Sequence, residues 1–259
     1  MTIKLHSKQA FANMKKSGQL AAQVLDYLTP HIVEGVSTNH IDQLAHDFII
    51  KHKAIPAPLH YKGYPKSICT SVNHVVCHGV PDENKILQAG DILNVDVTVI
   101  LDGWYGDTSR IYWVGDVALK AQKLTHITYQ AMMAGIDAVK PDGYLGDIGA
   151  VIESMASQHR YSVVRDFCGH GIGQIFHDEP NVLHYGKKGS GAKLRTGMFF
   201  TIEPMLNIGS HEVKLLQDGW TAVTRDKSLS AQFEHTVAVG DHGVEIFTQS
   251  PDGLHHPPY

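Results

Sequence analysis

DILNVDVTVILDGWYGDTSR, residues 91–110, is an apolar stretch of sequence that carries Asp96 and Asp107 on either side of a turn signal. The dipeptide Asp102-Gly103 favours a two-residue hairpin turn. In the resulting register Thr98 lies opposite Asp107, and Asp96 falls on the same face as Asp107, about 7 Å away at the backbone. Because burying an unpaired carboxylate costs several kcal/mol, the sequence requires a partner that compensates these charges.

A faint internal repeat relates this segment to a second one 107 residues further on. The offset aligns LQAGDILNVD, residues 87–96, with LRTGMFFTIE, residues 194–203, and superposes Asp96 on Glu203. Because identity is low, chance similarity of two helix–strand units is an alternative. The interpretation we favour is two similar halves that face each other across a shared site and deliver one carboxylate each.

Four acids therefore stand alone in apolar strand-like sequence: Asp96, Asp107, Glu203 in MFFTIEPML and Glu234 in SAQFEHTVAV. A single acid of this kind is usually paired with a cation or placed at a strand end in water. Four together favour a metal centre, because two divalent cations would balance four carboxylates and leave room for a neutral nitrogen ligand. Such a donor set suits Mn, Fe, Co or Zn, with bridging carboxylates and metals about 3.5–4 Å apart.

Three of the 18 histidines stand in informative contexts. His170 and His177 occur in CGHGIGQIFHDEP, and His78 occurs in VVCHGVP. The glycines around His170 argue against a helix and allow the backbone to approach a ligand closely. A dinucleotide-binding loop is the alternative, but the third glycine of that fingerprint is missing at the required place.

Composition limits the remaining possibilities. The chain has 259 residues, 43% hydrophobic and 19% charged, and a formal net charge of -4. Nothing in this balance favours nucleic acid as a ligand. The N-terminal sequence has no apolar signal segment, no stretch is long enough to span a membrane, and three cysteines do not suggest a disulfide framework. We therefore expect a cytoplasmic protein with no membrane partner.

The chain is predicted to form a single domain over residues 1–259, with a disordered tail at 249–259. Periodicity and turn signals predict helices over 8–28, 38–53, 117–139 and 145–159. The same signals predict strands, besides the hairpin, over 67–72, 75–78, 161–165, 198–205, 212–217, 220–223, 232–239 and 244–248.

Five segments closely resemble type I methionine aminopeptidases: HYKGYPKSICTSVNHVVCHGVP, GDILNVDVTVILDGWYGDTSR, CGHGIGQIFHDEP, GMFFTIEPML and TRDKSLSAQFEHTVAV. The resemblance covers nearly the whole chain, and the spacing of its Asp, Asp, His, Glu, Glu set is highly specific. It implies the α+β pita-bread fold, an antiparallel sheet backed by helices with internal pseudo-twofold symmetry. It also implies removal of the initiator methionine from nascent proteins whose second residue is small.

The resemblance implies a role for each ligand. Asp107 and Glu234 would bridge two divalent ions (Co, Mn, Fe or Zn), Asp96 would complete one site, and His170 and Glu203 the other. Metal-bound hydroxide would then attack the first peptide bond. The residue matching Glu203 also transfers a proton to the leaving amine, so Glu203 is a candidate catalytic residue as well as a ligand.

Other positions match catalytic and substrate-binding residues of the family. His177 corresponds to the residue that hydrogen-bonds the tetrahedral intermediate, and His78 to the one near the leaving nitrogen; a structural tether is the alternative for His78. The methionine pocket corresponds to Tyr61, Tyr64, Cys69, Phe176 and Trp220, each of which could instead be ordinary core. A monovalent-cation site corresponds to Asn73, Val75 and Ser230. Two departures from the family pattern, Pro58 for cysteine and His60 for glycine, lie in the loop through which substrate enters.

Related enzymes offer alternatives. Proline-specific aminopeptidases and dipeptidases share the five ligands but usually carry an extra N-terminal domain, and type II methionine aminopeptidases carry a helical insertion. A non-catalytic binding module on the same scaffold would have lost a ligand, and all five are present. We therefore expect a monomeric enzyme whose partners are the N-termini of nascent polypeptides at the ribosome.

Overall fold

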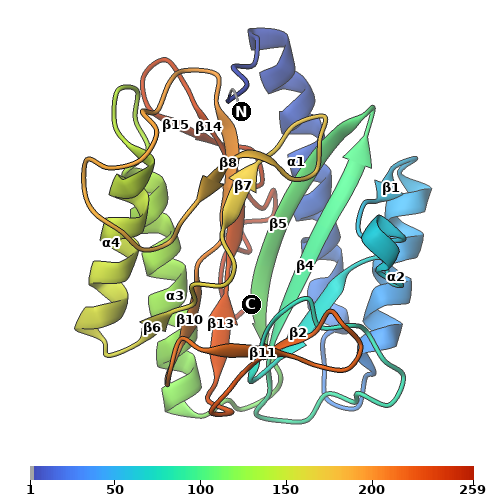
Figure 1. The fold of residues 1–259 in the computed structure, drawn as a ribbon. Helices are drawn as coiled ribbons and strands as arrows, with labels where there is room; N and C mark the ends of the chain where they lie inside the picture. The colour runs from blue at the N-terminus through green and yellow to red at the C-terminus, as the bar shows by residue number, and fades with distance from the viewer. Residues whose placement is uncertain (1–2) are drawn as a thin grey trace.

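A curved antiparallel sheet forms the centre of the molecule, and long helices cover one side of it (Figure 1). The structure is a computed structural model, and it describes residues 3–259. The helices are α1 (Lys8–Leu28), α2 (Thr38–Lys51), α3 (Leu119–Asp137) and α4 (Leu145–Gln158), with short 3-10 turns η1 (Thr29–His31) and η2 (Tyr61–Gly63). Among the described residues, no helix combines the length and apolar character needed to cross a bilayer.

The main sheet has nine strands in the order β1-β4-β5-β14-β9-β7-β8, with β2 paired to β4 and β15 paired to β14. Its strands are β1 (Ile55–Pro56), β2 (Cys69–Val72), β4 (Ile92–Leu101), β5 (Trp104–Trp113), β7 (Gly169–Gly171), β8 (Asp178–Val182), β9 (Phe199–Ile202), β14 (Glu234–Val239) and β15 (Val244–Ile246). Two three-stranded sheets contain β3 (Val75–Cys77), β6 (Ser162–Val163), β10 (Met205–Asn207), β11 (Val213–Leu215), β12 (Ala222–Thr224) and β13 (Ser230–Gln232).

The β4–β5 hairpin has the register that its two-residue turn predicts. Thr98 pairs with Asp107, and Asp96 pairs with Ser109. Because successive side chains alternate between the faces of a strand, Val95 and Val97 point to the opposite side from Asp96. Both valines are fully buried in the core beneath α1 and α2. The apolar face of β4 thus packs against the helices, and its polar face is on the other side of the sheet.

Helix α1 packs on this hairpin at close range. Leu20, Val24 and Leu28 recur four residues apart, are almost completely buried, and present one apolar stripe to the sheet. Gly106 on β5 allows the approach, because a Cβ there would lie 2.3 Å from the backbone of Ser17. A side chain at position 106 would force the helix away from the strand.

The two halves of the chain repeat each other in space. Helices α2 and α4 differ by 107 positions at both ends. The same offset relates two isolated bridges, Ser37 with Ile86 and Tyr144 with Lys193. The hydrogen bonds that flank these bridges also repeat at that offset. The weak repeat in the sequence therefore corresponds to a real duplication of local structure.

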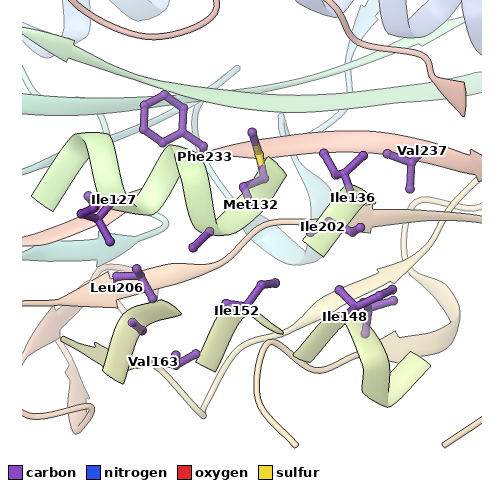
Figure 2. Packing of buried hydrophobic residues seen from close by; sticks show 14 of the residues in the cluster. Ile127, Met132, Ile136, Ile148, Ile152, Val163, Ile202, Leu206, Phe233 and Val237 are labelled. Carbon is purple, nitrogen blue, oxygen red and sulfur yellow. The ribbon is translucent and has the colours of Figure 1, made fainter. Parts of the chain in front are cut away.

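Each half has its own core. The second one lies between α3, α4 and the strands of the C-terminal half, as Figure 2 shows. Ile127, Met132 and Ile136 of α3 face Ile148 and Ile152 of α4, and the strand residues Ile202, Phe233 and Val237 complete the packing. Fully burying each of these side chains contributes about 1.5–3 kcal/mol, so this core holds the second half of the sheet in place.

The helices begin and end within two residues of their predicted bounds, whereas several strands differ. The predicted strand 198–205 is divided into β9 and β10, because Pro204 has no N–H to donate to a ladder. The predicted strand 232–239 is divided at Phe233, and β13 begins before it, at Ser230. Strands β1, β7 and β8 were not predicted, since they are short or rich in glycine and proline.

The prediction that residues 249–259 are disordered was wrong. The Ser250 hydroxyl donates to the buried carboxylate of Asp26, 2.8 Å away, and the Tyr259 hydroxyl donates to the carbonyl of Ile111 at 3.0 Å. The tail lacks regular secondary structure, but it satisfies buried polar groups of α1 and β5. Composition alone cannot reveal such contacts, because they join residues more than 140 positions apart.

Candidate active site

Three of the four acids lie on neighbouring strands in the middle of the main sheet. Ser109 on β5 pairs with Asp96 of β4 on one side and with Glu234 of β14 on the other. Asp107 lies two residues before Ser109 on the same face of β5, and its Oδ1 accepts a hydrogen bond of 2.6 Å from Thr98. Strand pairing therefore brings these three carboxylates to one point.

Two threonines fix β5 against β14 at this point. The Thr108 hydroxyl donates to the carbonyl of Glu234 at 2.7 Å, and the Thr236 hydroxyl donates to the carbonyl of Asp107, also at 2.7 Å. Each hydrogen bond joins one strand to the backbone of an acid on the other. The separation of Asp107 and Glu234 is thus set by main-chain geometry as well as by side-chain rotamers.

His170 and Glu203 reach the same point from the second half of the chain. His170 lies in the middle of β7, and its Nε2 is 3.6 Å from Asp107 Oδ2 and 3.7 Å from Glu203 Oε1. The ligand atoms of Asp107, His170 and Glu234 all lie within 4.8 Å of one another. The sequence predicted Glu203 inside a strand, but the structure has it in the break between β9 and β10.

The glycines beside His170 serve strand packing. A Cβ at Gly169 would lie 2.3 Å from the carbonyl oxygen of Thr201, and one at Gly171 would lie 2.0 Å from that of Glu179. The sequence predicted close approach of the backbone to a ligand, whereas these glycines allow close approach of β7 to β8 and β9. The close packing of these strands fixes the position of His170, which is 8% exposed.

Burial makes ionisation of all four acids unfavourable. It raises the pKa of Asp96 to about 7 and raises the pKa of Asp107, Glu203 and Glu234 well above their usual values. Repulsion between neighbouring carboxylates adds to the upward shift for the last three. Burial also lowers the pKa of His170 to about 4, so its imidazole is neutral at physiological pH. Each group is thus poised to bind a cation in place of a proton.

No lysine or arginine within residues 3–259 forms an ion pair with any of these four acids. Among the described residues, His170 is the one basic side chain at ion-pair distance from these carboxylates, and it is neutral. Four converging carboxylates with one imidazole and no balancing cation form a donor set for Mn, Fe, Co or Zn. The residues present therefore fit a centre of divalent metal ions, and two divalent ions would balance four carboxylates.

Three hydrogen bonds that were not expected from the sequence orient Glu203. Oε1 of Glu203 accepts from the Thr201 hydroxyl at 2.7 Å, and Oε2 accepts from the Gln232 amide at 3.3 Å. The backbone N–H of Glu203 donates to Nε2 of His184, 3.0 Å away. A polar residue two positions before Glu203 on the same strand face was the available signal for Thr201. Nothing local connects His184 or Gln232 with this acid.

The four acids and His170 lie on the wall of one cavity of ≈ 380 Å³. All the candidate catalytic and substrate-binding residues line it too: Tyr61, Tyr64, Cys69, His78, Phe176, His177 and Trp220. Further lining residues that the sequence did not single out are Lys62, Thr98, Asp166, Phe167, Cys168 and Met205. Residues spread over both halves of the chain thus share a single space.

His177 stands beside the acids with a defined hydrogen-bond partner. Its Nδ1 lies 3.0 Å from the Tyr61 hydroxyl, and its ring is 4.3 Å from that of His170, centroid to centroid. Burial, followed by the charges of His170, Lys62 and His78, lowers the pKa of His177 to about 3. With the Tyr61 hydroxyl as donor, the neutral ring carries its proton on Nε2 and can donate it to a ligand.

His78 approaches the cavity from a strained turn. Its φ of 56° is in the left-handed region, which is uncommon for a residue with a side chain. Its ring stands edge-on to Phe167 at 5.3 Å, and burial lowers its pKa. The strain is typical of a side chain aimed for function, although the contact with Phe167 also ties down the turn.

Aromatic rings and a thiol form the apolar part of the wall. Tyr61 packs on Phe176 at 4.9 Å, and Tyr64 stands edge-on to Trp220 at 5.1 Å. Cys69 pairs with Asp96 across β2 and β4, so the apolar wall adjoins the acids directly. Of the two unusual loop residues, Pro58 lines the cavity, while His60 adopts a left-handed backbone with a φ of 68°.

The three residues of the expected monovalent-cation site lie on adjoining segments. The N–H of Ser230 donates to the carbonyl of Asn73 at 2.9 Å, and Val75 pairs with Val223 on β12. The Ser230 hydroxyl is buried and has no hydrogen-bond partner among the described residues. An orphaned buried hydroxyl is compatible with an ion or a water molecule at this place.

Comparison with known proteins agrees with this geometry. Residues 12–241 match the sequence model of Metallopeptidase family M24. A methionine aminopeptidase of Rickettsia prowazekii (strain Madrid E) is 60% identical over all of both chains, and one of Escherichia coli (strain K12) is 46% identical over 97% of this chain and 96% of its own. The chain belongs to metallopeptidase family M24, among the methionine aminopeptidases.

The fold of the family is also found in solved structures. The crystal structure of methionine aminopeptidase from Rickettsia prowazekii superposes with a TM-score of 0.94 and 59% identity, covering 95% of this chain and all of that one. The α+β pita-bread fold expected from the sequence, with its curved antiparallel sheet and repeated halves, is thereby confirmed. The family assignment also makes this chain a metallopeptidase, in agreement with its carboxylate-rich centre.

Proposed function

We propose that this protein removes the N-terminal methionine from nascent proteins and peptides whose second residue is Gly, Ala, Ser, Thr, Cys, Pro or Val. The observation that carries the proposal is the convergence of Asp96, Asp107, His170, Glu203 and Glu234 in one cavity beside an apolar wall. Relatives that are 46% to 60% identical and named methionine aminopeptidase support the same substrate. An aminopeptidase needs a cavity that accepts one side chain and one free amine. This cavity has an apolar wall for the side chain and a polar region for the amine.

The charges and the wall of the cavity orient the substrate. The four acids and His170 form the polar part of the cavity wall, so the free amine of a peptide binds on that side and away from the apolar residues. The methionine side chain then packs against Tyr61, Tyr64, Cys69, Phe176 and Trp220, because a thioether packs well against aromatic rings. The first peptide bond lies between these two anchors, close to His177.

Divalent ions held by the five ligands would lower the pKa of a bound water and polarise the carbonyl oxygen of the first peptide bond. The chain's own groups provide the rest of the reaction. Burial raises the pKa of Glu203, and its carboxylate accepts a proton and returns it to the leaving amine. His177 donates from Nε2 to the oxygen that gains charge, and His78 contacts the leaving nitrogen, each contributing a few kcal/mol in the transition state.

The remaining assignments belong to the same proposal. Two divalent ions occupy the centre, and a monovalent cation binds near Asn73, Val75 and Ser230. The enzyme acts as a monomer in the cytoplasm, on N-termini that emerge from the ribosome. The relationship to bacterial methionine aminopeptidases supports this setting.

The test is metal-dependent release of methionine. We would remove metal with a chelator and then measure methionine released from Met-Ala-Ser and Met-Leu-Ser before and after adding Co, Mn, Fe or Zn. We expect cleavage to be restored by metal and confined to the Met-Ala-Ser peptide. Absence of release with every metal, while ions are bound, would overturn the proposal and favour a binding module. Equal cleavage of both peptides would contradict the specificity for a small second residue.

A further inference from the structure

Lys62 stands at the cavity on a tightly held turn. It is the middle residue of η2, with φ 48° and ψ 27°, in the left-handed region that side chains rarely adopt. The turn is closed by backbone hydrogen bonds from His60 to Tyr64 at 2.8 Å and from Tyr64 to Tyr61 at 2.9 Å. A backbone of this kind costs about 1–3 kcal/mol and persists only where the surroundings fix it. The turn therefore presents Lys62 in a defined direction.

The ammonium group of Lys62 has no carboxylate partner in the described part of the chain. Its Nζ lies over the ring of Tyr61, 5.3 Å from the centroid, and the hydroxyl of that ring is 3.0 Å from Nδ1 of His177. The positive charge is close enough to contribute to the lowered pKa of His177. An unpaired cation thus stands next to the residue that faces the first peptide bond.

The direction of the substrate puts its third residue near this cation. With the free amine at the acids, the rest of the peptide leaves through the rim of the cavity, where the exposed lining residues are Lys62, Asp166 and His177. An extended peptide advances about 3.3–3.6 Å per residue, so the third residue lies about 7 Å beyond the methionine. The flexible four-carbon stem of a lysine and its three donors can reach a carboxylate in that range.

We propose that Lys62 forms a subsite for a carboxylate carried by the third residue of the substrate. This inference rests on the proposed aminopeptidase function. The carboxylate can come from an acidic side chain at the third position or from the C-terminus of a tripeptide. Lys62 is then a specificity-determining residue that acts after the scissile bond, where the methionine pocket has no influence.

Asp166 is the other ionic side chain on the cavity wall outside the five candidate ligands. It adjoins Phe167, whose ring contacts His78, whereas Lys62 adjoins Tyr61 and His177. Its negative charge opposes binding of an acidic substrate and is the same in every Lys62 variant. Comparison of variants with the unaltered enzyme therefore isolates the contribution of Lys62.

The expected effect is modest, because Lys62 is exposed to solvent. Exposed ion pairs contribute about 0.2–1 kcal/mol, which corresponds to a preference of up to about five-fold. The preference should appear mainly in KM, since the contact is equally strong in the enzyme–substrate complex and in the transition state. It should also weaken as ionic strength rises, because salt screens exposed charges.

The experiment uses the metal-loaded enzyme and amidated peptides Met-Ala-Asp-Ser, Met-Ala-Asn-Ser and Met-Ala-Lys-Ser. We expect the Asp peptide to be cleaved about two- to five-fold more efficiently than the Asn peptide. Lys62→Gln should remove that ratio, and Lys62→Glu should shift the preference to the Lys peptide. Lys66→Gln is the matched control, because Lys66 is on the same loop but bonds Asn39 outside the cavity, and it should keep the ratio. Met-Ala-Ser with a free or amidated C-terminus tests the second source of the carboxylate.

The outcomes separate this inference from the function on which it rests. An Asp to Asn ratio that is equal in the unaltered enzyme and in Lys62→Gln, with both peptides cleaved, overturns the subsite and leaves the aminopeptidase function standing. A loss of the ratio in Lys66→Gln as well would assign it to the general charge of the loop and also overturn the subsite. Cleavage of none of the peptides by the unaltered enzyme would overturn both proposals.

Discussion

The hydroxyl of Thr201 donates to Oε1 of Glu203, 2.7 Å away, and accepts the backbone N–H of His170 at 3.0 Å. One side chain therefore sets the relative position of two candidate ligands that come from different segments of the chain. Because the hydroxyl hydrogen is directed at the carboxylate, this contact holds Glu203 in one rotamer. The precision of the centre depends on such neutral neighbours as much as on the ligands themselves.

Replacing Thr201 by valine should lower kcat for Met-Ala-Ser by about ten-fold or more, because hydrogen bonds to charged groups contribute about 1.5–3 kcal/mol. It should also weaken binding of Mn, measured by calorimetry. Thr201→Ser keeps the hydroxyl and should retain most of both properties. Equal behaviour of the valine and serine variants would show that the hydroxyl has no part in orienting Glu203.

Replacing Glu203 by glutamine should nearly abolish turnover, by about 100-fold or more, because the amide cannot accept and return a proton. The measurement is methionine release under saturating substrate, with thermal unfolding as a check on folding. Glu212→Gln is a suitable control, since Glu212 is exposed and pairs loosely with Arg225 at 3.9 Å. A Glu203→Gln variant with full activity would refute the proton-transfer role.

Asp96 should destabilise the protein at neutral pH when metal has been removed. Burial raises its folded-state pKa from 3.8 to about 7, so the folded state retains a proton that the unfolded chain releases. Its contribution to stability is therefore fully present below about pH 4 and is lost as pH rises through about 7. In chelator, Asp96→Asn should unfold at a higher temperature than the unaltered protein at pH 8 and at a similar one at pH 4.

Adding Mn should reverse the order of these two proteins at pH 8. The unaltered chain binds the ion with all its carboxylates and is stabilised by mass action, whereas Asp96→Asn has lost a ligand. Thermal unfolding of both proteins, with chelator and with Mn, is the required measurement. If the chelated proteins show the same difference at pH 4 and pH 8, burial does not govern the ionisation of Asp96.

The buried ion pair of Arg110 with Asp26 should be important for stability but not for chemistry. Both side chains are nearly inaccessible, and Ser250 donates to the same carboxylate. Arg110→Met should cost about 3–5 kcal/mol of unfolding free energy, because it leaves Asp26 buried and unpaired. The double variant Arg110→Met, Asp26→Leu should recover much of that loss in denaturant titrations.

The exposed pair of Arg165 with Glu153, 3.5 Å apart, provides the control for this prediction. Arg165→Met should change the unfolding free energy by less than about 1 kcal/mol, because solvent screens the pair. Equal effects of Arg165→Met and Arg110→Met would mean that burial of the Arg110–Asp26 pair has no energetic consequence.

Local sequence was sufficient wherever local interactions set the structure. The turn at Asp102-Gly103 determines the hairpin register, and therefore the placement of Asp96 and Asp107, because a two-residue turn leaves one way to pair the strands. Helix bounds were equally accessible, since capping and apolar periodicity act within a few residues. The repeat of 107 residues also predicted that Asp96 and Glu203 serve one centre.

Other features depend on contacts that no local pattern reports. Glu203 leaves the strand because of Pro204, and His170 lies in a strand that its glycines disguised. The tail 249–259 is held by hydrogen bonds to Asp26 and to the carbonyl of Ile111, both far away in the sequence. Resemblance to a known family, rather than periodicity, supplied the residues of the apolar wall.

By itself, the sequence determined the number and type of the candidate ligands, the hairpin that carries two of them, and the duplication of the fold. The tertiary structure decided which neutral side chains orient those ligands, how close the carboxylates come, and that Lys62 stands unpaired beside His177. The physical reason is range. Turns, caps and alternation act over a few residues, whereas burial and the pKa shifts that follow from it depend on strands that are far apart in the chain.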